Sequence, residues 1–357
     1  MNKRDLYISL VLCLKKEGSS VKIIDMHCDT IYEILEGRKR GENISLRESS
    51  LMIDLMKLKK SGYSVQNFAL FVEQKKGESS FGKVKELLAV FREEMKENQD
   101  LIAQVYTTGD ILENEKRGKL SALLTVEEGG VCEGKLENLY FLYEQGVRMM
   151  TLTWNFPNEI GYPNFSENRD CYTPDVENGL TQTGIHFVEE MERIGMIIDV
   201  SHLSDAGFYD VLNHTKKPFV ASHSNARAVC PWVRNLTDDM LKKLGERGGV
   251  AGLNYCADFL REHSFENVDG IARRPREGGY ASVEDIAIHA GHMADVGGIE
   301  CVGLGSDFDG IPCNPELSGA DEMQKLVDAL VKKGFRESEI DKILYQNVFR
   351  LYQDVLN

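Results

Sequence analysis

Several features that identify common classes of protein are missing from this sequence. It has no Cys-x-x-Cys pair, and its eight cysteines are scattered, mostly among apolar or small residues. This usage is typical of reduced thiols and gives no sign of a thiolate zinc site. An excess of positive charge is also missing: 57 acidic residues outnumber 42 lysines and arginines, and the formal net charge is −15. Binding to a nucleic acid requires a basic surface, so the sequence predicts no nucleic-acid partner.

Long hydrophobic runs are missing as well. No stretch approaches the ~20 apolar residues that a membrane span requires. An apolar run at residues 6–14 is short, lacks a small-residue cleavage site and is followed directly by two lysines. This pattern favours an N-terminal helix within an extension at residues 1–20 over a signal peptide. We therefore expect a cytoplasmic protein that does not associate with membranes.

The sequence does contain a repeated alternation of apolar, β-rich runs and helical patterns. The expected strands are 22–27, 65–71, 121–127, 148–154, 196–201, 218–222, 249–254 and 301–306. The expected helices are 82–98, 134–145, 181–194, 204–213, 236–247, 282–296 and 320–334. Such alternation indicates a parallel sheet, and eight rounds predict a single (β/α)₈ TIM barrel over residues 1–357. An open doubly wound sheet is the alternative, but no Gly-x-Gly-x-x-Gly follows any expected strand.

Two connections are longer than a barrel needs. Residues 155–180 follow the fourth strand and residues 255–281 follow the seventh. Both leave the carboxyl ends of their strands, the face at which barrel enzymes carry their active sites. Loops of this length are usually lids or binding loops, so we expect both to be active-site loops.

Ionisable residues gather at the same strand ends. They are His27, Asp29, Glu127, His202, His223 and Asp307. Side chains two apart on a strand point the same way, so the His-x-Asp at the first strand places a nitrogen and an oxygen ligand together. A barrel brings all of these strand ends into one ring. The pattern therefore predicts a metal site at the mouth of the barrel.

The number of ligands suggests two metal ions. His27 and Asp29 would hold one ion and His202 with His223 the other, with Glu127 bridging them. Imidazole with carboxylate suits zinc, and two ions that share a water or hydroxide lower its pKa. Asp307 could then carry the proton from the attacking water to the leaving group.

Successive blocks of the chain resemble the membrane (renal) dipeptidase family, a zinc-dependent branch of the metal-dependent, amidohydrolase-like hydrolase barrels. The blocks are DMHCDT, VEEGG, GVRMMTLT, DVSHLS, ASHSNARAVC and GLGSDFDG, in order over residues 23–310. The resemblance implies a two-zinc dipeptidase that also accepts a C-terminal D-residue, with attack by a metal-bridging hydroxide. It also implies the ligand set above, catalytic roles for Glu127 and Asp307, and Arg234 as the clamp for the dipeptide carboxylate.

The chain departs from the family pattern at two positions. Glu128 stands where the family often has glycine, and Trp154 stands where many members have a histidine that contacts substrate. Because an indole can neither carry a proton nor bind a metal, Trp154 could instead form an aromatic wall of the substrate pocket. We expect Asn254 and Tyr255, after the seventh strand, to supply further substrate contacts.

Other readings stay open from the sequence. The chain could be a barrel hydrolase of another amide or of a phosphodiester, although the negative charge disfavours the phosphodiester. Trp154 also leaves open a non-hydrolytic, metal-containing binding protein. Small dipeptides are the expected partners. A homodimer is a further possibility, since barrels of this kind commonly pair.

Overall fold

The computed structural model describes most of the chain: residues 21–75, 78–165, 171–262, 281–312, 314 and 316–356, with the backbone of 266–268 and 271–273. The helix expected within residues 1–20 and parts of both long loops lie outside these residues. Over the part of the chain that is described, no helix combines the length and the apolar character needed to cross a bilayer.

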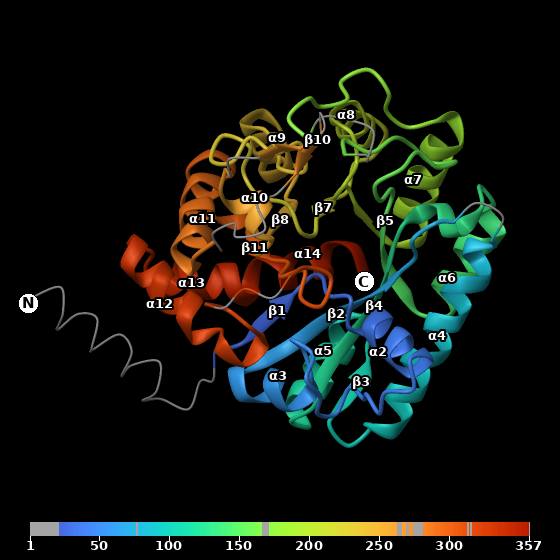
Figure 1. Cartoon of the computed structure of the whole chain (residues 1–357), viewed down its shortest axis with the longest axis vertical. Coiled ribbons are helices and arrows are strands. Elements are labelled where there is room, and N and C mark those ends of the chain that lie inside the picture. The colour runs from blue at the N-terminus through green and yellow to red at the C-terminus, as the bar shows by residue number, and fades with distance from the viewer. Residues whose placement is uncertain are drawn as a thin grey trace, which may run out of the picture.

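Eight parallel strands close into a barrel, which confirms the predicted (β/α)₈ fold (Figure 1). The last strand pairs with the first through Leu304 and Asp25, and this pairing closes the ring. The expected strands all occur, several of them shorter than the apolar runs that predict them. They are β1 (Ile23–Asp25), β2 (Tyr63–Phe71), β4 (Leu120–Glu127), β5 (Val147–Thr151), β6 (Ile197–Asp199), β7 (Val220–Ala221), β8 (Val250–Leu253) and β11 (Val302–Leu304).

Helices surround this barrel, and each helical range expected from the sequence overlaps one of them. These are α4 (Ser80–Glu97), α6 (Leu136–Glu144), α7 (Gln182–Ile194), α8 (Asp205–His214), α9 (Asp238–Glu246), α11 (Val283–Gly297) and α12 (Gln324–Lys333). The sequence reading missed α2 (Thr30–Lys39), α3 (Leu55–Ser61), α5 (Thr108–Lys116), α13 (Glu337–Asp341) and α14 (Asn347–Leu356).

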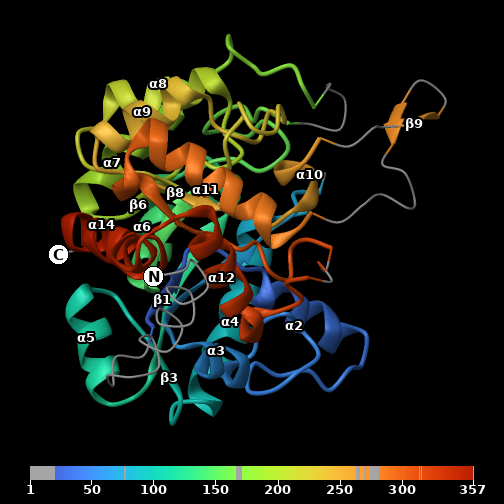
Figure 2. The ribbon, with the colours of Figure 1, turned by 90° about the vertical axis from the view of Figure 1, so that its left-hand side faces the viewer.

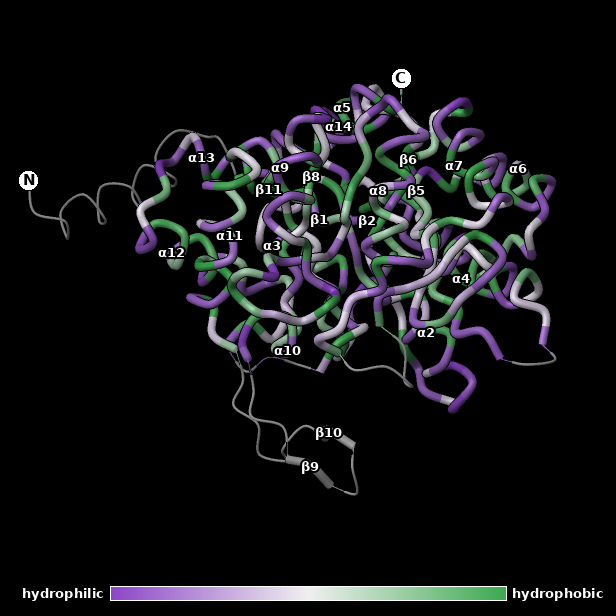
Figure 3. Tube along the Cα trace, turned by 90° about the horizontal axis from the view of Figure 1, so that it is seen from above, coloured by the Kyte–Doolittle hydropathy of each residue, from purple (hydrophilic) through white to green (hydrophobic). Residues whose placement is uncertain are grey.

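The base of the barrel, at the amino ends of its strands, is filled by apolar side chains. Ile24, Leu123 and Ile197 from three strands form one buried cluster with Leu351 and Tyr352 of α14. Figure 2 shows α14 and α10 (Ala257–Leu260) at opposite ends of the barrel. Hydrophobic stretches follow the central strands, whereas hydrophilic ones predominate along outer loops (Figure 3). The base is therefore a packed core, and the opposite end is left for chemistry.

Two local features differ from the prediction. β3 (Ile102–Gln104) pairs with the first residues of β4 outside the barrel. The sequence reading missed β3 because it has three residues and only Ile102 is buried. The connection after β8, expected as one long loop, contains the short helix α10 and an antiparallel backbone pairing between β9 (Glu266–Val268) and β10 (Ile271–Arg273).

Candidate active site

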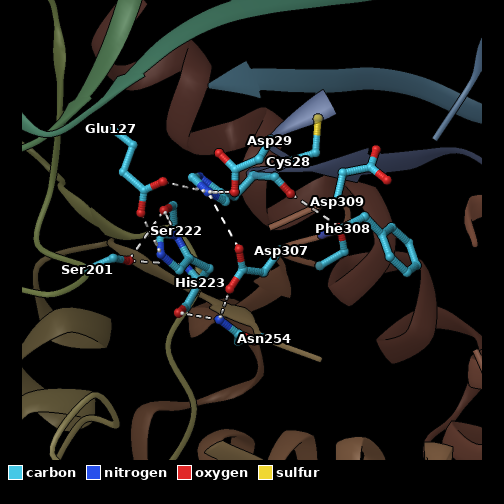
Figure 4. A network of polar contacts seen from close by, with 12 residues as sticks. Cys28, Asp29, Glu127, Ser201, Ser222, His223, Asn254, Asp307, Phe308 and Asp309 are labelled. Atoms are coloured by element: carbon cyan, nitrogen blue, oxygen red, sulfur yellow. Dashed lines mark hydrogen bonds and ion pairs between the residues drawn. The ribbon is translucent and has the colours of Figure 1, made fainter. Parts of the chain in front are cut away.

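The structure brings together at one mouth all the ionisable residues that the sequence singles out. They follow five strands of the barrel: His27 and Asp29 after β1, Glu127 at the end of β4, His202 after β6, His223 after β7 and Asp307 after β11. Figure 4 shows the carboxylates of Asp29, Glu127 and Asp307 directed toward a common centre beside His223. Barrel closure has gathered residues that the sequence separates by up to 280 positions.

Glu127 lies between two groups of histidines. Its Oε2 is 3.3 Å from the Nε2 of His27, while its Oε1 is 2.9 Å from the Nε2 of His202 and 3.5 Å from that of His223. The two Nε2 atoms of His202 and His223 are 3.0 Å apart. One carboxylate therefore presents a separate oxygen to each group, as a bridging ligand does.

Asp29 and Asp307 extend the cluster on the side of His27. The Nε2 of His27 is 3.6 Å from Asp29 Oδ2 and 3.8 Å from Asp307 Oδ1. Two sets of possible ligand atoms lie within 4.8 Å of one another: His27 with Glu127 and His223, and His27 with Asp29 and Asp307. Asp307 is therefore itself one of the possible metal ligands, as well as the acid that faces the cluster.

The charges of this cluster fit a bound cation. Burial raises the pKa of Asp307 to about 7 and that of Asp29 to about 6. Burial opposes the charged form of His27, but the carboxylates of Glu127 and Asp29 outweigh it and raise the pKa of His27 well above its usual value. Three buried polar atoms of the cluster have no hydrogen-bond partner among the described residues: both ring nitrogens of His27 and the Oδ1 of Asp29. Buried polar atoms and crowded carboxylates of this kind are stabilised by a divalent ion, and the N and O donors suit zinc.

Two further contacts orient the histidines, and the sequence did not reveal them. His223 Nδ1 lies 2.7 Å from Ser222 Oγ, whose hydroxyl donates to Asp199 Oδ2 at 2.6 Å. His202 Nδ1 lies 3.0 Å from Asn155 Oδ1. Donation from each Nδ1 leaves the Nε2 lone pair facing the site, as in metal-binding histidines. Burial lowers the pKa of His202 to about 4, which keeps its ring neutral.

Strained backbone concentrates at this mouth. Among the described residues, five non-glycine residues have a positive φ, and four of them are His202, Asp307, Asp309 and Glu128, with φ between 63° and 91°. Left-handed backbone costs a non-glycine residue about 1–3 kcal/mol and persists where the surrounding structure enforces it. Strain of this kind is typical of functional sites.

Arg234 is a buried guanidinium at the edge of the site. It is 4% exposed, and among the described residues it forms no ion pair with a carboxylate. It donates only long hydrogen bonds, 3.3 Å to Ser224 Oγ and 3.4 Å to His223 O, and its Nε has no partner among described residues. The guanidinium lies over the ring of Phe259, 5.3 Å from the centroid. A buried, weakly satisfied guanidinium suits an anionic group brought by a ligand.

Asn254 and Tyr255, which the sequence predicts to contact substrate, are both buried. Asn254 Nδ2 donates to Asp307 Oδ2 at 2.9 Å and to His223 O at 3.2 Å, so it orients Asp307. Tyr255 is 1% exposed, and its ring packs against Phe308 with the centroids 5.4 Å apart. Among the described residues its hydroxyl has no hydrogen-bond partner, and its contact with substrate stays a prediction.

Trp154 lies at the mouth within a group of aromatic side chains. Its ring centroid is 6.3 Å from that of His202, 5.0 Å from Phe71 and 5.3 Å from Phe156. Phe71 in turn meets Tyr32 at 5.3 Å. We call Tyr32, Phe71, Trp154 and Phe156 the aromatic wall. The sequence singled out only Trp154, because the other three come from segments that meet it through the fold alone.

The family model for membrane dipeptidase (peptidase family M19) matches residues 17–357. An uncharacterized dipeptidase of Schizosaccharomyces pombe is 30% identical over 354 residues, which cover 93% of this chain and 80% of that protein. An uncharacterized protein of Klebsiella pneumoniae, from the pqqA 5' region, is 32% identical over 242 residues, covering 66% of this chain and 82% of that one.

Solved structures give the same assignment. The crystal structure of dipeptidase AC, a metallopeptidase of family M19, is 26% identical with a TM-score of 0.83, covering 95% of this chain and 99% of that one. A Rhodobacter sphaeroides metallopeptidase bound to a phosphinate mimic of the dipeptide L-Ala-D-Ala is 25% identical with a TM-score of 0.82, covering 94% of this chain and 100% of that one. From its barrel, its strand-end cluster and these matches, the chain belongs to the membrane dipeptidase family, peptidase family M19.

Proposed function

We propose that this protein is a zinc-dependent dipeptidase that holds two zinc ions at the mouth of its barrel. The observation that carries the proposal is the position of Glu127, whose two oxygens face His27 on one side and the pair His202 and His223 on the other. Family membership supports a metal-dependent peptidase. The N and O donor set supports zinc.

His27, Asp29 and Glu127 would hold one ion, and Glu127, His202 and His223 the other. Bound metal would supply Lewis-acid activation of a water molecule and of the scissile carbonyl. Asn155 and Ser222 keep the rings of His202 and His223 turned toward the site.

Asp307 is the proposed acid–base residue. Its Oδ1 faces His27 at 3.8 Å, and its Oδ2 is held by the amide of Asn254 at 2.9 Å. A carboxylate fixed at the edge of the cluster can take the proton of the attacking water and give it to the departing amine. Asn254 keeps that carboxylate in place during both transfers.

Arg234 is the proposed clamp for the free carboxylate of the dipeptide. Its guanidinium is buried beside the site and makes only long hydrogen bonds to the described residues, so a ligand carboxylate could form two parallel hydrogen bonds with it. A clamp at this fixed distance from the reacting atoms restricts the substrate to very short peptides. The L-Ala-D-Ala mimic bound to the Rhodobacter sphaeroides relative supports acceptance of a C-terminal D-residue here.

The test combines zinc content with a panel of dipeptides that carry L or D isomers at each position. We expect two zinc ions per chain, hydrolysis of dipeptides, and no cleavage of the same dipeptides amidated at the C-terminus. Two bound zinc ions without turnover of any dipeptide would support the alternative, a metal-containing binding protein. Trp154 is the reason for this alternative, because an indole cannot carry a proton. Absence of bound zinc and of turnover after zinc addition would reject both.

A further inference from the structure

Glu128, the second glutamate of VEEGG, is fully buried next to the cluster of possible metal ligands but interacts with other parts of the mouth. Its Oε1 accepts hydrogen bonds from Gly130 N at 2.7 Å, from Gln74 Nε2 at 3.1 Å and from the side-chain amide of Asn158. Its Oε2 accepts one from the backbone N–H of Trp154 at 2.8 Å. One carboxylate thus joins the end of β4 to the loops that follow β2 and β5.

Two features of Glu128 are energetically unfavourable, its backbone conformation and the burial of its carboxylate. Its φ of 91° is left-handed backbone, which a glycine adopts without penalty and a glutamate does not. Its carboxylate has no exposure to water, and burial raises its pKa to about 7. A glycine at this position would remove both features. The four hydrogen bonds that Glu128 accepts offset these two costs. The role of Glu128 therefore depends on which part of the chain these bonds fix in place.

The bonds hold the first residues of the loop after β5. Asn158, bound to Glu128, also donates to Leu152 O at 2.9 Å and accepts from the backbone N–H groups of Ile160 and Gly161 at 2.7 and 3.0 Å. Glu128 and Asn158 together therefore fasten residues 154–161 to the end of the barrel.

This segment brings two side chains to the site. The indole of Trp154 lies 6.3 Å from the ring of His202, and the amide oxygen of Asn155 lies 3.0 Å from His202 Nδ1. The neighbouring Gly130 leaves room for the arrangement, because a Cβ there would lie 1.8 Å from Gln74 Nε2 and 2.5 Å from Glu128 Oε1.

We propose that Glu128 is a positioning residue that holds Trp154 in place within the aromatic wall, and so gives the enzyme a preference for dipeptides with a large apolar or aromatic side chain. This inference rests on the proposed dipeptidase activity. Where the wall is firm, a flat apolar side chain can stack on the indole, and aromatic pairs are favourable beyond the area that they bury. Where the segment is loose, alanine dipeptides lose little and aromatic ones lose that contact.

The test is Glu128→Gly, which removes the carboxylate and the backbone strain together. We compare kcat/KM, at saturating zinc, for dipeptides with phenylalanine at either position and for Ala-Ala. The preference for phenylalanine over alanine should fall about tenfold, the low end of what a lost apolar contact contributes to specificity. The same substitution in a Trp154→Ala background should leave the ratio unchanged, since the indole to be positioned is absent.

Fluorescence provides a readout that does not depend on turnover. The chain has two tryptophans, so Trp232→Phe leaves Trp154 as the only tryptophan, and excitation at the red edge of the absorption band avoids the tyrosines. In that background Glu128→Gly should shift the emission to the red and increase quenching by acrylamide. Glu133→Gly is the matched control. Glu133 also has a positive φ, of 51°, but its carboxylate binds Ser79 and Lys135.

Each outcome decides the matter. An unchanged substrate preference with unchanged Trp154 emission in Glu128→Gly overturns the inference. If that variant does not fold, Asn158→Ala cuts the next link to the same segment and should give the same two changes; their absence also overturns it. A wild-type protein that hydrolyses no dipeptide refutes the proposed function instead, while the emission still shows whether Glu128 positions Trp154.

Discussion

The two ends of this barrel contain different kinds of side chain, apolar at the base and ionisable at the mouth. At the base, apolar side chains such as Leu123 and Ile197 pack against Leu351 of α14 with almost no exposure. At the mouth, carboxylates and imidazoles crowd together, and four non-glycine residues there have left-handed backbone. The base thus contributes stability, and the mouth gives some of it up for a site that a cation can complete. Substitutions at the two ends should therefore differ in what they change.

The largest effect is expected at the centre of the mouth. Glu127→Gln replaces the carboxylate between the two histidine groups with a neutral amide, so zinc retention should weaken. Turnover of dipeptides should fall by at least about a thousandfold, the upper range for a single transition-state contact. Zinc content and kcat/KM measure the effect, with Glu133→Gln as the control. Full activity in Glu127→Gln would contradict the bridging role.

A substitution at the base should lower stability and leave substrate binding unchanged. Leu351→Ala should lower the free energy of unfolding by about 2–5 kcal/mol, because it opens a cavity in a fully buried cluster. Urea denaturation measures this change, and KM for a dipeptide should stay the same. Leu112→Ala, at a leucine that is 43% exposed, is the control and should alter stability little. An equal loss of stability in both variants would mean that α14 does not close the core.

Arg234→Ala should act mainly on substrate binding. Each hydrogen bond to the dipeptide carboxylate is worth about 1.5–3 kcal/mol for a charged pair, so the loss of both should raise KM by at least about a hundredfold. Steady-state kinetics at fixed zinc measure it. Arg234→Lys keeps the charge but loses the paired geometry and should lie between the two. If Arg234→Ala leaves KM for dipeptides unchanged, the clamp assignment fails.

The smallest effect is expected at Asn155, which contacts the proposed ligand His202 and not the metal itself. Asn155→Ala removes the acceptor that orients His202, so the zinc dissociation constant should rise about tenfold, the low end for such contacts. Competition with a chromophoric chelator at constant pH measures it. Asn155→Asp keeps an acceptor oxygen and should restore most of the affinity. An unchanged dissociation constant in Asn155→Ala would show that the ring of His202 is held by other contacts.

The two glutamates of VEEGG show how far the sequence could be read. Glu127 was identified from its place at a strand end, and the structure puts it at the centre of the cluster. Glu128 was noted only as a departure from a family pattern, because its partners Gln74 and Asn158 lie 54 and 30 positions away. No local pattern announces a hydrogen bond over such a separation.

Errors in the reading have equally physical causes. β3 and α5 were missed because short elements carry too few apolar residues to show a period. Asn155 gave no signal, since its role depends on His202, 47 positions later.

The order of strands and helices, the barrel and the strand-end positions of the acids and imidazoles followed from the sequence alone, because apolar period and chain order are local properties. Tertiary structure alone decided which carboxylate oxygen faces which histidine, which polar side chains orient the ligands, and that Glu128 fastens the segment carrying Trp154. These depend on atoms brought together by closure of the ring, and a closed ring is a property of all eight strands at once.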